Sequence, residues 1–205
     1  MPRRILSFIL LTAVLFIVPA MSWLYLQNGK NYRKSKLKDL HDFGAFTLTA
    51  PLTDGNGNPF TADSLKKGFF IVTIMKDAAD QNTAKQLQRL QTAFEPDRTD
   101  VHLLSILPAD AKIKDFEAEN KIKPRMWHVV SAAEPEKVAA DLKLNLNAKI
   151  DSSYFVLLDT ARHIRRYYNV QNTAQVNAMA EIIAMIMKPK PTDRKSTRLN
   201  SSHVD

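Results

Sequence analysis

The chain has 205 residues, of which 45% are hydrophobic, and it carries a formal net charge of +8. This length is enough for one domain with a buried core and a membrane segment, but it is too short for two ordinary domains. The sequence contains no cysteine, which excludes disulfides, thiol redox chemistry and thiolate metal sites.

The basic excess lies at the N-terminal end of the chain. Residues 1–38 hold seven basic side chains and no acidic one, whereas residues 39–192 hold 19 of each sign. Nucleic-acid binding requires Arg and Lys clustered on the folded domain itself. The charge distribution therefore predicts no nucleic-acid partner, and it places the excess charge beside a membrane, where anionic lipid attracts it.

The N-terminal segment predicts a membrane anchor in the form of one transmembrane helix. About 22 residues without charge, from Ile5 to Leu26, are enough for a helix that crosses the ~30 Å hydrocarbon core. Trp23 and Tyr25 stand at the end of this run, where aromatic rings favour the membrane interface. We therefore expect a membrane anchor in residues 1–27 and a basic linker in residues 28–38.

Cleavage of this segment stays open as an alternative. Small residues at Val18-Pro-Ala20 resemble a signal-peptidase site, so a cleaved signal peptide competes with a retained signal anchor. No cysteine follows the segment, which excludes attachment as a lipoprotein.

The C-terminal tail does not read as natural sequence. Residues 193–203 spell DRKSTRLNSSH, which is the translation of a common short-read sequencing adapter. We expect residues 191–205 to be non-native, and residues 39–190 to form the folded domain.

The first half of the domain predicts strands and one long helix. Residues 46–49 alternate apolar and polar side chains, and the Asp-Gly-Asn-Gly sequence at 54–57 favours a turn, so an opening hairpin is expected. The apolar run 69–75 predicts a strand buried on both faces near the centre of the sheet. Helical spacing follows over 80–94, until Pro96 prevents its continuation.

The second half of the domain completes an α/β pattern. Further strands are expected at 101–107, 126–130, 154–158 and 163–168, with helices after Pro108, at 135–144 and at 174–187. The order is βαβ followed by ββα, with a right-handed crossover. It predicts a thioredoxin-like domain in which a mixed central sheet is flanked by helices.

Within this pattern, residues 150–159 (Ile-Asp-Ser-Ser-Tyr-Phe-Val-Leu-Leu-Asp) and 164–168 (Ile-Arg-Arg-Tyr-Tyr) resemble a specific segment of the Sco/SenC family. These proteins are thioredoxin-like copper chaperones of cytochrome c oxidase assembly, and the segment carries Asp-His-Ser before a strand, a turn and an Ile-Arg-aromatic stretch. The resemblance covers most of residues 40–187.

The resemblance implies a location and a partner. It implies a single-pass protein of the bacterial inner membrane, with its domain on the periplasmic side and an oxidase subunit or assembly protein as partner. The five basic residues between Lys30 and Lys38 conflict with this, because the positive-inside rule taken alone places the domain in the cytoplasm.

The copper site of the family needs two thiolates and an imidazole, because soft sulfur ligands hold copper. The resemblance places these ligands at Met75, Ala79 and Ser152, so we expect a degenerate metal position and no catalytic or cofactor-binding residue. The chain is interpreted as a non-catalytic binding or assembly factor, and not as an enzyme. The alternative is a Cu(I) chaperone in which Met75 pairs with His128 or Met126.

The remaining histidines and acidic residues predict structural roles. His41, His102, His128 and His163 share no ligand spacing, and His102 is expected to be a half-buried structural residue within its strand. Asp77 and Asp80 are expected to complement the dipole at a helix start.

A basic cluster, formed by Lys121, Lys123 and Arg125, is expected near the edge of the sheet. Such a cluster is either solvated surface or a site for an acidic partner.

Overall fold

The computed structural model describes residues 3–61, 64, 68–75, 77–78, 80–94, 100–144 and 154–187, with side chains of the first helix from residue 12 onward. The helices are α1 (Arg3–Lys38), α2 (Gln81–Phe94), α3 (Ile113–Glu119), α4 (Pro135–Asp141) and α5 (Thr173–Ile186). The strands are β1 (Leu52–Asp54), β2 (Pro59–Phe60), β3 (Phe69–Ile74), β4 (Val101–Pro108), β5 (Trp127–Ala132), β6 (Tyr154–Leu158) and β7 (Ile164–Asn169).

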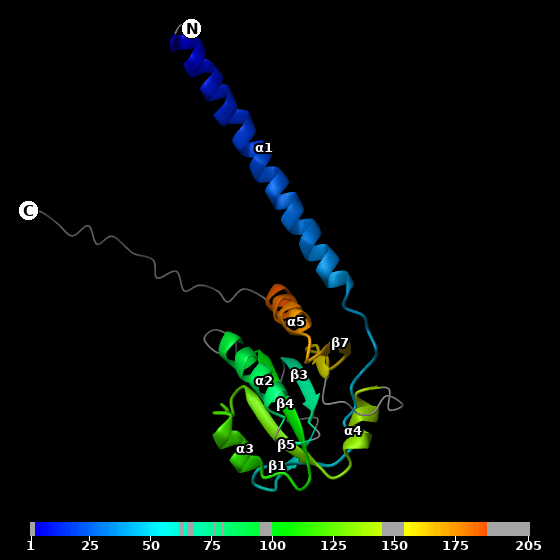
Figure 1. Cartoon of the computed structure of the whole chain (residues 1–205). Helices are drawn as coiled ribbons and strands as arrows, with labels where there is room; N and C mark the ends of the chain where they lie inside the picture. Colours follow the sequence, from blue (N-terminus) through cyan, green and yellow to red (C-terminus); the bar gives the residue numbers. More distant parts are fainter. Residues whose placement is uncertain are drawn as a thin grey trace, which may run out of the picture.

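The strands form one mixed sheet in the order β2-β1-β5-β4-β3-β6-β7. Its central strands β3, β4 and β5 lie side by side in Figure 1. Strands β3, β4 and β5 are parallel, whereas β6 pairs antiparallel with β3 and β7 pairs antiparallel with β6. All six residues of β3 are buried, which confirms the predicted interior strand. The predicted βαβ and ββα units, and with them the thioredoxin-like domain, are confirmed.

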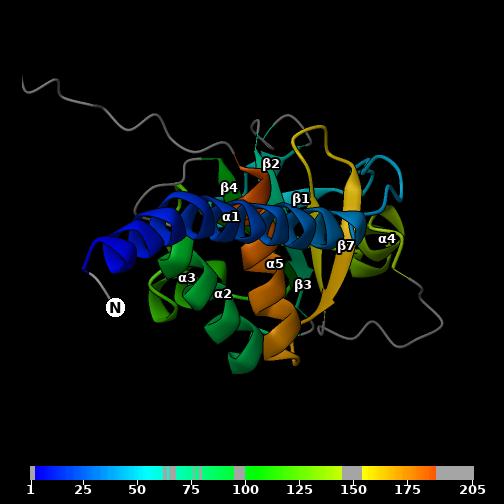
Figure 2. The same cartoon turned by 90° about the horizontal axis from the view of Figure 1, so that it is seen from above.

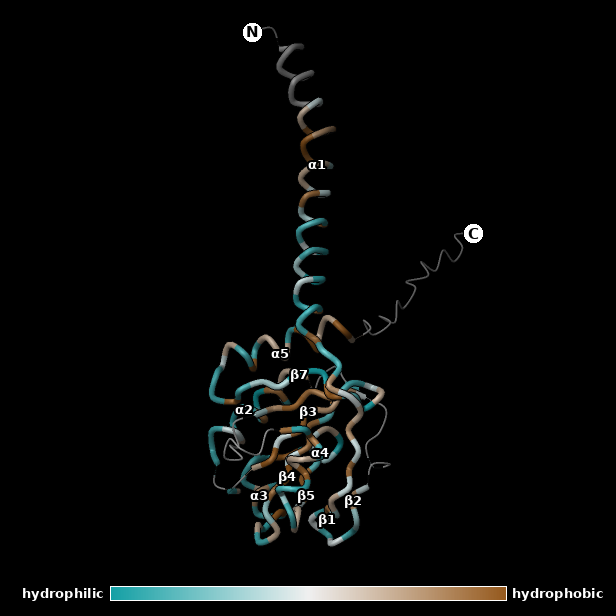
Figure 3. Tube along the Cα trace, turned by 90° about the vertical axis from the view of Figure 1, so that its right-hand side faces the viewer, coloured by the Kyte–Doolittle hydropathy of each residue, from teal (hydrophilic) through white to brown (hydrophobic). Residues whose placement is uncertain are grey.

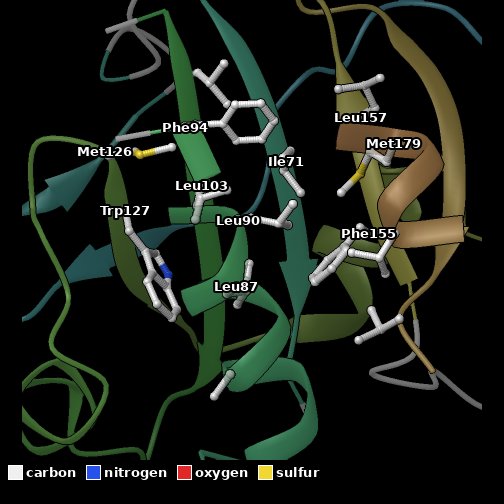
Figure 4. Packing of buried hydrophobic residues seen from close by; sticks show 14 of the residues in the cluster. Ile71, Leu87, Leu90, Phe94, Leu103, Met126, Trp127, Phe155, Leu157 and Met179 are labelled. Atoms are coloured by element: carbon white, nitrogen blue, oxygen red, sulfur yellow. The ribbon is translucent and has the colours of Figure 1, made fainter. Parts of the chain in front are cut away.

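Two apolar layers cover the sheet. On one face, side chains of β3, β4 and β5 pack against α2, α3 and α5, with Leu87, Trp127 and Met179 among the buried residues (Figure 4). On the other face, they pack against α4 and the chain before β1. The indole Nε1 of Trp127 donates a hydrogen bond to Ser105 Oγ at 2.9 Å, so the most polar atom of this large core side chain is satisfied.

Helix α2 follows β3 because its sequence supplies both a buried stripe and a cap. Residues 84, 87, 90 and 94 are buried at the predicted spacing, and this stripe faces the sheet. Asp80 caps the helix: its Oδ1 accepts the Thr83 N–H at 3.1 Å, and its Oδ2 accepts the Thr83 hydroxyl at 2.7 Å. Asp80 therefore lies at the helix start as predicted and acts there as a hydrogen-bonded cap, whereas the dipole contribution expected of Asp77 and Asp80 stays a prediction.

The predicted strand at 46–49 is wrong. The observed hairpin joins β1 to β2, and its turn is the predicted 54–57 sequence, where Asp54 Oδ1 accepts the N–H groups of Asn56 and Asn58. These hydrogen bonds, led by those from Asn58, lower the pKa of Asp54 below its ordinary value. Thr49 is held instead by Asp141, which accepts its N–H and its hydroxyl, both at 2.7 Å. A tertiary contact thus replaces the strand that alternation predicted.

The helix α1 runs without interruption to Lys38, so residues 28–38 continue the helix rather than form a separate linker element. Apolar and hydrophilic turns follow one another along it, and the turns next to the domain are hydrophilic (Figure 3). Among the residues that the structure describes, no helix combines the length and apolarity needed to span a membrane. The adapter-like residues 193–203 lie outside the described residues.

The chain that leaves α1 covers the outer edge of the sheet. In this edge segment, residues 39–46, the N–H groups of His41 and Phe43 donate to carbonyls of β7, and Ile164 donates back to Gly44. Such pairing protects an edge strand that would otherwise present unpaired backbone groups.

A small polar cluster adds to this attachment. The carboxylate of Asp42 lies 2.9 Å from His163 Nδ1 and 3.7 Å from Arg165 Nη1. The hydrogen bond with His163, and then the one from the Gly44 N–H, lower the pKa of Asp42 from 3.8. Because the folded pKa is lowered, this carboxylate stabilises the fold above pH 3.8, and that contribution is lost as the pH falls through the folded pKa.

We expect the pKa of Asp42 to lie below 3.8 in the wild-type chain and to rise toward 3.8 in His163→Ala, because the substitution removes the largest cause of the shift. The side-chain carboxyl chemical shift, followed by NMR across an acid titration, measures both values. Asp54, whose pKa is lowered by hydrogen bonds within its own turn, provides the control, since His163→Ala must leave its titration unchanged. Equal Asp42 titrations in the two proteins would contradict the assignment.

We expect Asp80→Ala to lower the free energy of unfolding by about 1 kcal/mol, since it removes the cap of α2. Asp80→Asn is the matched control, because its amide oxygen still accepts the Thr83 N–H, and its loss should be clearly smaller. Urea denaturation followed by far-ultraviolet circular dichroism measures both. If alanine and asparagine destabilise the protein equally, the cap is not the cause.

Candidate functional site

The candidate site lies where β3 ends and α2 begins. Met75 directly follows β3, and its N–H donates to the Ile106 carbonyl at 2.8 Å, so its backbone continues the pairing of β3 with β4. Its side chain is 1% exposed and belongs to the core on the α2 side of the sheet. Met75 therefore fills the core, and its thioether is not presented to solvent. The other two predicted positions, Ala79 and Ser152, lie outside the described residues.

Next to this turn, a polar groove of about 590 Å³ lies between α2 and α3. Helix α2 contributes Lys85 to its wall, and Lys112 at the N-cap of α3 contributes together with Asp115 and Glu119 of that helix, so both signs of charge are present. The described residues that line it are Asp77, Ala78, Gln81, Ala84, Lys85, Gln88, Lys112, Asp115, Phe116, Glu119 and Asn120. The described residues of this lining supply amides, charged groups and the apolar side chains of Ala78, Ala84 and Phe116, and none of them carries a hydroxyl, thiol or imidazole that could act as a nucleophile or a soft ligand.

The structure does not bring Met75 together with the ligands suggested for a Cu(I) site. On β5, His128 pairs with Leu104 of β4, and Met126 comes just before Trp127, which pairs with Leu103. On β3, Met75 comes just after Ile74, which pairs with Ile106 of β4. At about 3.3 Å per residue, the two suggested partners lie roughly 10 to 16 Å from Met75 along the strands, and they also lie two strands away. The suggested pairing of Met75 with His128 or Met126 is therefore wrong as a geometric hypothesis.

Strand register instead brings two histidines together, which sequence reasoning missed. The rings of His102 and His128 lie 5.7 Å apart on neighbouring strands, and His102 stacks on Phe70 at 4.9 Å. His102 is 5% exposed, so it is buried rather than half-buried, although the structural role predicted for it agrees with this stacking. Only the β4–β5 register could have revealed this pair, because the 25 residues between His102 and His128 do not correspond to a recognisable ligand spacing.

The histidine pair forms part of an aromatic row. Phe60 lies 6.2 Å from His128, so the rings of Phe70, His102, His128 and Phe60 cross the sheet from β3 to β2. Among the described residues, no three or more His, Asp or Glu side chains gather in a group suited to a metal ion.

The basic cluster at Lys121, Lys123 and Arg125 does not lie at the edge of the sheet. It precedes β5, which pairs with β4 on one side and with β1 on the other, so the hairpin of β1 and β2 occupies the position expected to be the edge. The Gln91 amide bridges this segment, since its Nε2 donates to the Lys121 carbonyl and its Oε1 accepts the Lys123 N–H. The backbone of the cluster is therefore part of the packing against α2.

Comparisons with known proteins identify the fold through solved structures. No protein-family model matches the chain, and no curated protein matches it. A SCO1/SenC family lipoprotein from Bacillus anthracis superposes with a TM-score of 0.57 at 16% identity, over 70% of this chain and 95% of that one.

Two further structures show the same relationship. BsSco, described as a member of the Sco family of cytochrome c oxidase assembly proteins, gives a TM-score of 0.57 at 15% identity, over 72% of this chain and 97% of its own. Yeast Sco1 with copper bound gives 0.51 at 16% identity, over 74% and 99%. The chain is therefore a cysteine-free protein with the thioredoxin-like fold seen in Sco-family structures.

Proposed function

We propose that the chain is a membrane-anchored, non-catalytic, Sco-like protein that acts as a binding or assembly factor in respiratory oxidase biogenesis. One observation is central: the strand-to-helix turn that would hold the thiolates of a Sco copper site has no cysteine, and the one sulfur that we place there, Met75, is 1% exposed. The fold is retained while the ligands for copper chemistry are absent.

The absence of thiolates bears on each activity of this fold. Disulfide exchange requires a thiolate that attacks and a second sulfur that is attacked, and the sequence supplies neither. Cu(I) prefers soft ligands, and strand register separates the buried thioether of Met75 from His128 and Met126, the partners suggested for it. These two arguments support a role in binding rather than in catalysis or copper transfer.

Attachment to a membrane is supported by the sequence of α1 and by the exposure of its apolar side chains. Residues 5–26 have no charge, and the apolar side chains of residues 14–18 are all more than half exposed. Apolar side chains exposed on an uncharged stretch of helix favour an apolar environment, which a bilayer supplies. We propose a single-pass protein of the bacterial inner membrane.

The side of the membrane and the partner rest on the resemblance to Sco proteins. We propose that the domain lies on the periplasmic side, and that its partner is an oxidase subunit or another assembly protein. The similarity to BsSco supports an oxidase-related partner, since BsSco is described as a member of a family of cytochrome c oxidase assembly proteins.

The first test is a Cu(I) titration of the full chain in detergent, by competition with a chromogenic chelator. We expect no competition at micromolar Cu(I), because the chain has no thiolate and Met75 is buried. Tight one-to-one binding would overturn the non-catalytic proposal. Loss of that binding in Met75→Ala, with retention in the core-filling control Met179→Leu, would assign it to a thioether site at Met75.

The second test measures assembled oxidase in the native host after deletion of the gene. We expect the deletion to lower the amount of assembled enzyme, and added copper not to restore it, because the proposed role is not copper delivery. The wild-type chain and Met75→Leu, which keeps a similar buried volume, should both restore assembly. Restoration by copper alone would indicate a copper-delivery role, and an unchanged oxidase level would contradict a role in assembly.

A further inference from the structure

The last turns of α1 contact α5 through one side of the helix. The Tyr32 hydroxyl donates to Glu181 Oε1 at 2.7 Å, and Arg33 donates to the Met185 carbonyl at 2.6 Å. Lys36 adds a 3.9 Å ion pair with Glu181. Seen from above, α1 crosses over α5 (Figure 2). These contacts attach the domain to a continuous helix, and no flexible segment intervenes between residues 28 and 38.

The opposite side of the same turns presents three lysines. Lys30, Lys34 and Lys38 follow one another at intervals of four residues, so they form one row along the helix, which we call the lysine stripe. Each of them is two residues from Tyr32 or Lys36, which corresponds to about 160 to 200° around the helix axis, whereas Arg33 lies at the border between the two sides, about 60° from Lys30. All three are exposed, and the structure shows no ion pair between them and the described acidic side chains.

Within α1, the lysine stripe has only basic and uncharged neighbours, and the first acidic residue of the chain, Asp39, pairs with Arg166. Residues 1–38 contain no Asp or Glu, so the stripe has no acidic neighbour along α1. The uncharged run that ends at Leu26 directly precedes it. With a rise of 1.5 Å per residue, Lys30 lies about 6 Å beyond Leu26 and Lys34 about 12 Å. These distances are comparable to the Debye length of about 8 Å at physiological ionic strength.

We propose that the lysine stripe binds the headgroups of anionic phospholipids while the other side of α1 holds α5. This inference rests on the proposed membrane attachment, and it adds the chemistry of the surface and the orientation of the domain. Lys30 and Lys34 contact the lipid surface most strongly, and Lys38 contributes less because it lies about 18 Å from Leu26. Helix α5 is thereby kept on the membrane side of the domain.

The test uses the full chain reconstituted into vesicles of phosphatidylcholine, alone or mixed with phosphatidylglycerol. A water-soluble amine-reactive reagent labels the lysines, and mass spectrometry gives the labelling rate at each one. We expect phosphatidylglycerol to slow labelling at Lys30 and Lys34 by about threefold or more, and high salt to remove this protection. Lys112 and Lys114, which are exposed at the start of α3, are internal controls whose rates should not depend on the lipid.

The outcomes separate this inference from the proposed anchoring. Equal labelling rates at Lys30 and Lys34 in both vesicles, with the chain still embedded after a carbonate wash, would overturn lipid binding by the stripe and leave the anchor intact. Release of the chain by carbonate would overturn the membrane anchor itself. Protection that occurs in native membranes but not in pure lipid vesicles would show that an acidic protein covers the stripe, and would also overturn the proposal.

Discussion

The burial of β3 and β4 on both faces is the constraint on which the rest of the structure depends. Every residue of β3 and seven of the eight residues of β4 are buried, so the sheet needs apolar cover on each side. Helices α2, α3 and α5 supply it on one face, and α4 with the chain before β1 supplies it on the other. Because β3 and β4 are parallel, the chain must cross over between them, and α2 is that crossover.

The junction between β3 and α2 is held by interactions of the chain's own residues. The turn after β3 is held by the packing of Met75, by its backbone pairing with Ile106 and by the cap at Asp80. None of these interactions requires a metal ion or a disulfide. A buried thioether at this position adds apolar contact where a thiolate would need solvation or a metal ion, so stability and ligand chemistry oppose each other at Met75.

The N-terminal part of the chain is integrated into the domain at two places. The edge segment pairs with β7 and is fixed further by Asp42, while the last turns of α1 contact α5 through Tyr32 and Arg33. Both contacts lie on the same end of the domain, where β7 and α5 follow one another in the chain. A helix attached in this way transmits its own orientation to the domain, which a flexible linker would not do.

The sequence by itself determined the order of the main elements, because periodic burial leaves a direct pattern in the chain. The apolar run at β3, the stripe of α2 and the turn at 54–57 are local features, and all three were predictable. The lack of a thiolate site was equally a matter of residue identity. Tertiary structure alone decided that Thr49 binds Asp141 instead of forming a strand. It also decided that the rings of His102 and His128 lie next to each other, and that Met75 lies far from His128 and Met126. These outcomes depend on strand register and on partners about 25 to 90 residues away, which no local pattern encodes.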